Sequence, residues 1–327
     1  MTNLVQPERQ ASFANRLVWL VRLALAGLIA TPTFVGLVAL SGMRNQYADL
    51  LAQFTAPALF ATVGLGLFLV FVKQRRWAAA AVVPAALLLI AVGPQWYPTA
   101  SRPEAGADTI RLYSANLWVR NRDLDAIAAS IRQADADVVM LIELGDATAP
   151  HLDALVGDYP HRIASPRIHR PNGAVRSVIA SRYPLTALPR PAGVEAVGAR
   201  AATPLGALNL VSIHLTRPWP FEESWGQISQ TMALDEMLEG LNGPVVVAGD
   251  FNSVSTARIG KQVQRDIGLR PAPGFPGTWP AAVPSALAIT IDQIYASPDL
   301  AFVSRRLGRP TGSDHRPVVV EITRAAD

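Results

Sequence analysis

The sequence contains no cysteine. Disulfide bonds, thiolate metal sites and a cysteine nucleophile are therefore excluded. A broad excess of positive charge is also missing from most of the chain. The net charge of +4 arises in residues 1–108, which hold eight Lys or Arg and four Asp or Glu, whereas residues 109–327 hold 21 of each sign. A neutral domain lacks the basic surface expected of a nucleic-acid-binding protein, which weighs against a nuclease.

Half of the residues are apolar, and three long uncharged apolar runs stand near the N-terminus. They are Leu23–Leu40, Phe54–Val72 and Trp77–Gly93. Each has roughly the 17–20 residues needed to cross the hydrocarbon core of a bilayer. We predict a tail at 1–16, three transmembrane helices within 17–93 and a linker at 94–108. A cleaved signal peptide is the alternative for the first run, and a buried soluble helix is the alternative for the third.

Basic residues predict the orientation of these helices. Most of them lie in the tail and around the second loop: Arg9, Arg16, Arg22, Lys73, Arg75 and Arg76. The loop at 41–53 has only Arg44, balanced by Asp49. By the positive-inside rule the tail and the second loop are cytoplasmic. With three spans, everything after Gly93 then lies outside the cytoplasm, on the outer side of a plasma or inner membrane.

From Thr109 onward, short apolar runs alternate with a few helical patterns. We expect strands at 110–117, 137–144, 177–183, 208–215, 245–248, 288–296 and 317–322, and helices at 124–134 and 227–241. No internal repeat is visible. The alternation predicts one α/β or α+β domain at 109–327.

Polar side chains stand where these strands end. They are Asn116, Glu143, His214, Asp250, Asn252, Asp314 and His315, and Asp292 lies within a strand. Each of them alone has a structural explanation, such as a salt bridge, a helix cap or a satisfied core histidine. Gly-Asp-Phe-Asn after the apolar run at 245–248 also reads as a turn with an Asx cap. Eight such coincidences in one domain favour a functional site, because buried carboxylates are costly unless they pair or bind a cation.

Carboxylates, amides and imidazoles define the chemistry of this set. Oxygen-rich sites suit Mg²⁺ or Mn²⁺ better than Zn²⁺, which prefers His and Cys. One hard divalent cation with carboxylates and histidines fits the attack of water on a phosphate ester.

Five motifs together carry a family resemblance. They are Gly249-Asp250-Phe251-Asn252, Ser313-Asp314-His315, Glu143 closing an apolar strand, Asn116 in Ser-Ala-Asn-Leu, and Ile291-Asp292-Gln293-Ile294. The set resembles the endonuclease/exonuclease/phosphatase superfamily, which includes pancreatic-type deoxyribonuclease, apurinic endonucleases, neutral sphingomyelinases and inositol polyphosphate 5-phosphatases. The resemblance covers about 109–325. It implies a four-layer α-β-β-α sandwich and Mg²⁺-dependent hydrolysis of a phosphodiester or phosphomonoester.

Metal ligands follow from the resemblance. It implies that Glu143 is the main ligand, that Asn116 lies near the metal and the phosphate, and that Asp314 is a further ligand on the metal side. One position departs from the pattern. Apurinic endonucleases carry an acid two residues after the Asn, and Trp118 stands there in this chain. A DNA-repair activity and a two-metal site are therefore less expected.

Catalytic roles are implied in the same way. Asp250 positions or deprotonates water, and Asn252 orients the phosphate. His315 resembles the catalytic histidine, and Asp292 resembles the carboxylate that orients it. His214 matches a histidine that some branches use as a second acid or hydrogen-bond donor.

Two further segments are candidates for substrate contacts. The segment 162–182 is rich in arginine, which suits phosphate binding, although a solvated loop is an equal alternative. The aromatic segment 217–225 could stack a base, hold a lipid or rest on the bilayer, or simply pack. The sequence predicts a membrane-anchored phosphoesterase acting on a membrane-proximal phosphate ester, such as a phospholipid. An extracytoplasmic nuclease and a catalytically silent binding domain are the alternatives.

Overall fold

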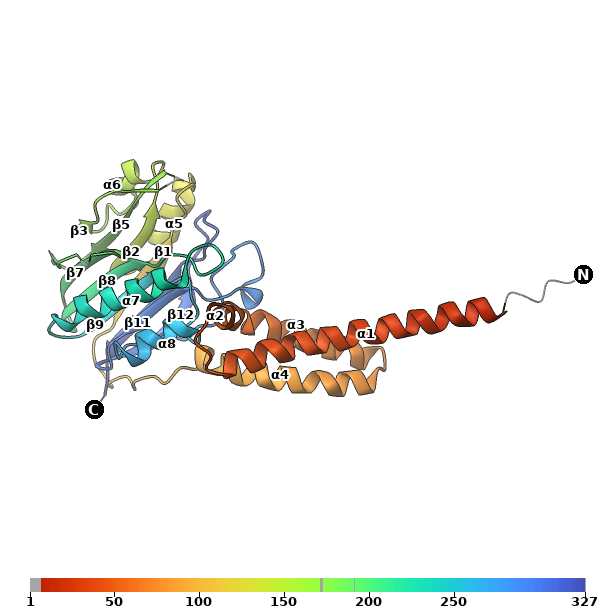
Figure 1. The fold of residues 1–327 in the computed structure, drawn as a ribbon. Helices are drawn as coiled ribbons and strands as arrows, with labels where there is room; N and C mark the ends of the chain where they lie inside the picture. Colours follow the sequence, from red (N-terminus) through yellow and green to blue (C-terminus); the bar gives the residue numbers. More distant parts are fainter. Residues whose placement is uncertain (1–6, 171–172, 191, 327) are drawn as a thin grey trace, which may run out of the picture.

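The computed structural model describes residues 7–170, 173–190 and 192–326. Four N-terminal helices project from one end of a two-sheet domain, and the start of α1 is the part furthest from that domain (Figure 1). The helices are α1 (Pro7–Leu40), α2 (Gln46–Gln53), α3 (Thr55–Phe71) and α4 (Arg75–Trp96).

Two of these helices, α1 and α4, are long and apolar enough to cross a membrane by themselves. The pair α2 and α3 passes the same test as a unit bent by 54°. By length and composition, the described residues therefore offer two candidate spans, or three if the bent pair counts as one. Helix α1 begins at Pro7 inside the predicted tail, whose residues 1–6 lie outside the described part. Helix α4 continues through Pro94 to Trp96, beyond the predicted end of the membrane region.

Helix α2 was not predicted as a separate element. It begins because Asn45 has an extended backbone and its side chain accepts hydrogen bonds from the backbone N–H groups of Tyr47 and Ala48. Buried Ala48, Ala52 and Gln53 give it an inner face. The segment between the first two apolar runs is therefore a packed helix rather than a simple loop.

The domain after the linker contains two sheets. The first runs in the order β12-β13-β1-β2-β5-β3, with β4 paired to β5. Its strands are β1 (Ile110–Asn116), β2 (Val138–Leu144), β3 (His161–Ala164), β4 (Ile168–Arg170), β5 (Gly173–Ser181), β12 (Leu300–Leu307) and β13 (Val318–Arg324). The second sheet runs in the order β10-β11-β9-β8-β7-β6. Its strands are β6 (Leu185–Ala187), β7 (Glu195–Thr203), β8 (Gly206–His214), β9 (Val245–Asp250), β10 (Arg270–Pro271) and β11 (Asp292–Ala296).

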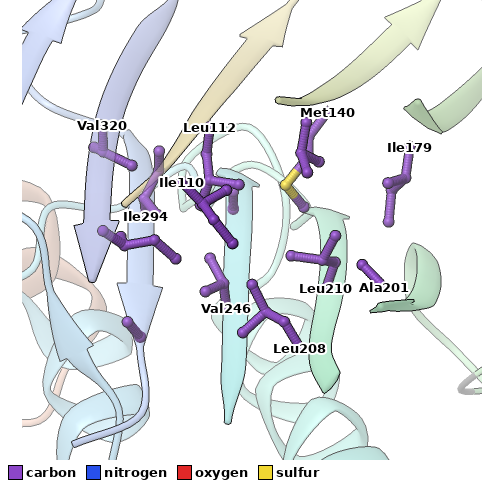
Figure 2. Packing of buried hydrophobic residues seen from close by; sticks show 14 of the residues in the cluster. Ile110, Leu112, Met140, Ile179, Ala201, Leu208, Leu210, Val246, Ile294 and Val320 are labelled. Carbon is purple, nitrogen blue, oxygen red and sulfur yellow. The ribbon is translucent and has the colours of Figure 1, made fainter. Parts of the chain in front are cut away.

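One parallel pair stands at the centre of each sheet. Strand β1 runs parallel to β2, and β8 runs parallel to β9, whereas the other pairs are antiparallel. The carboxyl ends of these four strands therefore reach the same end of the sandwich. Ile110, Leu112 and Met140 of the first sheet face Leu208, Leu210 and Val246 of the second (Figure 2).

Helices cover the outer face of each sheet. Helix α5 (Leu124–Ala134) packs Ile127 and Ile131 on the first sheet, and the short η1 (Ala149–His151) and α6 (Leu152–Leu155) lie beside it. Helices α7 (Ser224–Glu239) and α8 (Arg258–Arg265) cover the second, and η2 (Ser285–Leu287) lies in a long loop. This is the four-layer α-β-β-α sandwich that the sequence predicts.

Some predicted boundaries are wrong. The strand expected from residue 288 starts at Asp292, because the preceding segment forms only an isolated bridge between Trp279 and Ile289. The strand expected at 177–183 spans Gly173–Ser181. Strand β6 has only three residues and β7 is rich in alanine, so neither gave a clear apolar run.

The helices and the sandwich share a packed interface. Ala52 of α2 joins a buried cluster with Val254, Ala257 and Ile291 of the domain. At the end of α4, the backbone N–H of Gly274 donates to the Gln95 carbonyl over 2.7 Å. The first contact holds α2 against the end of the sandwich where β9 terminates, and the second holds the end of α4 against the segment that follows β10.

Candidate functional site

Glu143 reaches the space between the sheets because β2 is irregular at its end. Val139 and Leu141 of β2 face α5, and strict alternation would send Glu143 the same way. Instead the β2–β5 register shifts between Leu141 and Leu144, and Glu143 has a left-handed backbone with φ of 54°. The bulge redirects the carboxylate inward, where its Oε2 accepts from the backbone N–H of Val119 over 3.1 Å. Holding a non-glycine residue in this conformation costs about 1 kcal/mol or more, a strain that often marks functional sites.

Asp250 and Asn252 are positioned by the glycine before them. A Cβ atom on Gly249, whose φ is 146°, would lie 1.9 Å from the Ile213 carbonyl oxygen, so only glycine fits between β8 and β9. Asp250 Oδ1 accepts from the backbone N–H of Asn252 over 2.7 Å, which is the Asx turn that the sequence allowed. Asn252 also has a left-handed backbone, with φ of 48°. Asp250 and Asn252 therefore form an Asx turn and also direct their side chains into the site.

Asn116, at the end of β1, bridges the two sheets. Its Nδ2 donates to Asp250 Oδ2 over 3.2 Å, and its Oδ1 accepts from the backbone N–H of Trp118 over 2.9 Å. Gly145 lets the following loop approach, because a Cβ atom there would lie 2.0 Å from the Val119 carbonyl oxygen. Asn116 therefore ties the first sheet to the carboxylate of the second.

His214 ends β8 and stands among three carboxylates. Its Nε2 lies 3.3 Å from Glu143 Oε1 and 3.7 Å from Asp250 Oδ2, and its Nδ1 lies 3.8 Å from Glu195 Oε2. Burial alone would lower the pKa of His214, but the hydrogen bond that His214 donates to Glu195 and the charges of Glu143 and Asp250 outweigh burial and raise it. The imidazole is therefore held toward its protonated form.

Glu195 is the residue that the sequence analysis missed. It is buried, stands first in β7 and lies directly opposite His214 in the β7–β8 register. An acid opening an otherwise apolar, alanine-rich segment was the available signal, but β7 itself was not predicted.

His315 and Asp292 form a buried ion pair. His315 Nδ1 lies 2.9 Å from Asp292 Oδ2, and His315 Nε2 lies 3.8 Å from Asp250 Oδ2. Burial opposes the charge on His315, but the carboxylates of Asp292 and Asp250 outweigh it and raise its pKa to about 10. Burial raises the pKa of Asp250 to about 6, against the opposing effect of the two histidines. At neutral pH His315 is therefore an imidazolium, and Asp250 is an ionised carboxylate close to its titration point.

The site carries more negative than positive charge. Four carboxylates are brought together with only two imidazoles: Glu143, Glu195, Asp250 and Asp292 against His214 and His315. With both imidazoles protonated, the four carboxylates outnumber them by two charges, and the buried guanidinium of Arg305, which interacts with Asp292, offsets one of these. A net negative charge therefore remains among the described residues of the site. Such an excess fits a divalent cation, whose charge would balance it.

Two places in the site could hold that cation. Asp250, Asp292 and His315 offer ligand atoms within 4.8 Å of one another. However, the Nδ1 atom of His315 is bonded to Asp292, and an imidazolium is not a ligand. Glu143 is better suited, because its side chain is 13% exposed, carboxylate oxygen is a preferred Mg²⁺ ligand, and Asn116 lies at the neighbouring strand end.

Asp314 is not brought into this group. Its side chain is exposed, and its Oδ2 accepts from Trp279 Nε1 over 3.4 Å. Asp314 lies in a bend before β13, and its neighbour His315 is buried whereas Asp314 is exposed. Among the described residues, Asp314 therefore makes no contact with Glu143 or Asn116 that would support a metal-binding role.

Arginines of the segment 162–182 mostly pair with nearby acids. Arg162 pairs with Asp153, Arg167 with Asp146, and Arg182 with Asp135. Residues 171–172 and the side chain of Arg170 lie outside the described part. These pairings favour a structural role for most of the segment. In the aromatic segment 217–225, Phe221 and Trp225 are exposed, and Trp219 contacts Tyr47 of α2 edge to face, with ring centroids 4.9 Å apart.

Comparisons with known proteins identify the family and the fold. A sequence model described as the Endonuclease/Exonuclease/phosphatase family matches residues 113–315. A protein of this description from Beutenbergia cavernae DSM 12333 superposes with a TM-score of 0.52 at 20% identity, covering 67% of this chain and 72% of that one. One from Bacteroides vulgatus gives a TM-score of 0.55 at 16% identity, covering 66% of this chain and 99% of that one. No curated protein matches the sequence.

Proposed function

The chain belongs to the endonuclease/exonuclease/phosphatase family, whose members hydrolyse phosphate ester bonds, and we propose that it is a membrane-anchored, Mg²⁺-dependent phosphoesterase working outside the cytoplasm. The observation that carries the proposal is the net negative charge of a buried group in which four carboxylates (Glu143, Glu195, Asp250 and Asp292) surround His214 and His315, with Arg305 near Asp292 as the further cation. A divalent cation and an anionic phosphate together suit such a site better than a neutral substrate alone.

Glu143 is the proposed metal ligand, with Asn116 beside it. When bound, the cation supplies Lewis-acid polarisation of the phosphoryl oxygens. The left-handed backbone of Glu143 and the bond from the Val119 N–H fix the carboxylate in advance. Asp314 could join the metal only if its exposed loop turned inward, and no contact among the described residues supports such a movement.

Asp250 is the proposed base for water. Its pKa of about 6 leaves it ionised at neutral pH yet basic enough to accept a proton. The Asn116 amide and the Asn252 N–H hold its two oxygens in place. Asn252 Nδ2 donates to the Leu215 carbonyl over 2.9 Å, which fixes the amide that orients the phosphate.

The two histidines are the proposed donors to the developing negative charge. Asp292 holds His315 through Nδ1 and leaves Nε2 directed toward Asp250. Glu195 holds His214 in the same manner, with Nε2 directed toward Glu143. Each carboxylate–histidine pair keeps its imidazole charged and oriented, as electrostatic stabilisation of a phosphoryl-transfer transition state requires.

Attachment of α2 beside the site supports a substrate at the bilayer surface. Gln53 Nε2 donates to the Asn252 carbonyl over 3.4 Å, so the helices join the sandwich at its catalytic end. The exposed aromatics Phe221 and Trp225 follow His214 in the chain and suit contact with lipid. We therefore favour a phospholipid or another membrane-resident phosphate ester over a soluble one.

Metal-dependent turnover of bis-p-nitrophenyl phosphate tests the catalytic part of this proposal. The full-length protein in detergent should hydrolyse the diester with Mg²⁺ and stop with EDTA, and Glu143→Gln should abolish the Mg²⁺-dependent rate. The matched control is Glu236→Gln on α7, an acid outside the site. If wild type and Glu143→Gln are equally inactive under all metals, the binding-domain alternative replaces the enzyme.

Orientation has its own test. A reporter fused after Asp327 that is active only outside the cytoplasm supports the proposed topology, and one active only in the cytoplasm contradicts it. Rapid conversion of supercoiled plasmid would favour the extracytoplasmic nuclease, although the charge-neutral domain gives that alternative little support.

A further inference from the structure

A cavity of about 360 Å³ lies between the membrane helices and the sandwich, apart from the catalytic residues. One wall comes from the end of α1, the following turn and α2, and the other comes from α8 and Ile228 of α7. No residue of the candidate site lines it. Val38 and Ala39 of its lining belong to the last turn of α1. With α1 as a membrane span, as the proposed function has it, the cavity stands where that helix leaves the bilayer, at the level of the lipid headgroups.

The cavity has an excess of positive charge. Four cations and two acids line it: Arg44, Arg258, Lys261 and Arg265 against Asp49 and Asp266. Arg258 Nε lies 2.7 Å from Asp49 Oδ2, so this pair closes part of the wall and neutralises one cation. Burial and the neighbouring Arg265 lower the pKa of Lys261. A bound anion would offset the repulsion between these cations and stabilise the charged form of Lys261.

Apolar side chains form the rest of the lining. Val38, Ala39 and Met43 line the cavity beside Arg44, and Ala52 lines it near Asp49. A free inorganic anion would gain nothing from this apolar wall. A molecule with a phosphate at one end and a glycerol or acyl portion at the other would contact both.

We propose that this cavity binds the phosphate of an anionic phospholipid headgroup, with the glycerol portion of the lipid against the C-terminal end of α1. The bound lipid bridges α1, α2 and α8. Helix α8 follows Asn252 by a short segment, and α2 contacts Asn252 directly through Gln53. An anionic lipid in the cavity therefore fixes the catalytic end of the sandwich against the membrane.

Thermal unfolding of the purified full-length protein in neutral detergent tests this proposal. Short-chain phosphatidylglycerol should raise the midpoint of unfolding in a saturable manner, and short-chain phosphatidylcholine should not. Lys261→Gln with Arg265→Gln should weaken the apparent affinity for phosphatidylglycerol by about 30-fold, since each cation contributes about 1 kcal/mol. The matched control is Arg190→Gln with Arg200→Gln, two exposed cations outside the cavity, which should keep wild-type affinity.

Three results would overturn the proposal. Equal responses of wild type and the Lys261/Arg265 variant would show that the cavity does not bind the lipid. Inorganic phosphate giving the whole stabilisation, with nothing added by phosphatidylglycerol, would assign a free phosphate instead. If the double variant does not fold, the single variant Arg44→Gln, at an exposed position, replaces it. Its apparent affinity for phosphatidylglycerol should fall about fivefold, and an unchanged affinity would overturn the proposal. The readout requires no turnover, so it fails or succeeds independently of the proposed enzyme activity.

Discussion

Replacing Asp292 with asparagine should remove the negative charge that keeps His315 protonated, while the side chain at position 292 keeps nearly the same shape. Asp292 is the largest attractive influence on the His315 imidazolium, whose pKa of about 10 exceeds the ordinary value of about 6.5. An opposite charge at this range is worth roughly 1–3 pKa units, so the variant should lower the His315 pKa by that amount. Breaking one partner of a buried ion pair should also cost about 3–5 kcal/mol of unfolding free energy at neutral pH.

The sign of the pH dependence makes this prediction specific. A histidine whose folded pKa is raised stabilises the fold fully below its unfolded pKa of about 6.5, and the stabilisation is lost as pH rises through about 10. The stability deficit of Asp292→Asn should therefore be large at pH 6 and shrink above pH 10. With neutral imidazole at high pH, the wild-type carboxylate has lost its hydrogen-bonded cationic partner, so the deficit that comes from the His315 pair disappears and only the weaker interaction with Arg305 remains.

Nitrogen chemical shifts of ¹⁵N-labelled histidines would report the His315 pKa directly. EDTA is kept in all samples so that protonation alone is measured, and Asp314→Asn is the matched control, because Asp314 is exposed and contributes least. A His315 pKa that is unchanged in Asp292→Asn, or a stability deficit that is the same at pH 6 and above pH 10, would refute the ion-pair account.

Other predictions concern neighbouring parts of the site and the interface. Glu143→Gln should abolish Mg²⁺ binding measured by calorimetry and lower turnover by roughly 10²-fold or more. Asn252→Gly should relieve the left-handed strain yet remain as inactive as Asn252→Ala, which separates backbone strain from the lost amide; an active glycine variant would contradict this role. Activity should rise with pH as Asp250, whose pKa is about 6, becomes ionised, and Asp250→Asn should remove that limb of the profile. Asp49→Asn should change the free energy of unfolding by less than about 1 kcal/mol, because burial, which raises the pKa of Asp49, offsets its pair with Arg258, and diester turnover should not change.

Much of the fold follows from local sequence patterns. The apolar runs after Asp137 and Gly243-Pro244 became the central strands β2 and β9, because continuous burial needs continuous apolar sequence. The small-residue strand β7 escaped notice, because Ala and Gly carry little strand signal even where both faces are covered. Helix α2 also escaped, since its eight residues give too short a pattern.

The site was predicted in composition but not in detail. Strand ends located Asn116, Glu143, His214 and Asp250, since the parallel strands bring their carboxyl ends together. The inward turn of Glu143 depends on a bulge that pairs β2 with a distant strand, which no local pattern contains.

Two other features of the site depend on long-range pairing. The partnership of Glu195 with His214 arises from cross-strand register, so it could be recognised only once β7 and β8 were paired. Asp314 was grouped with its neighbour His315 by motif alone, although successive residues can face opposite ways.

Turnover by the full-length protein in proteoliposomes tests the central claim most directly. A panel of phospholipids and plasmid DNA would be offered side by side with Mg²⁺, with EDTA and with the Glu143→Gln variant. The account predicts hydrolysis of a phospholipid that requires both Mg²⁺ and Glu143, while the plasmid stays supercoiled. Rapid plasmid nicking with the lipids untouched, or the same turnover in EDTA and in Glu143→Gln, would contradict it.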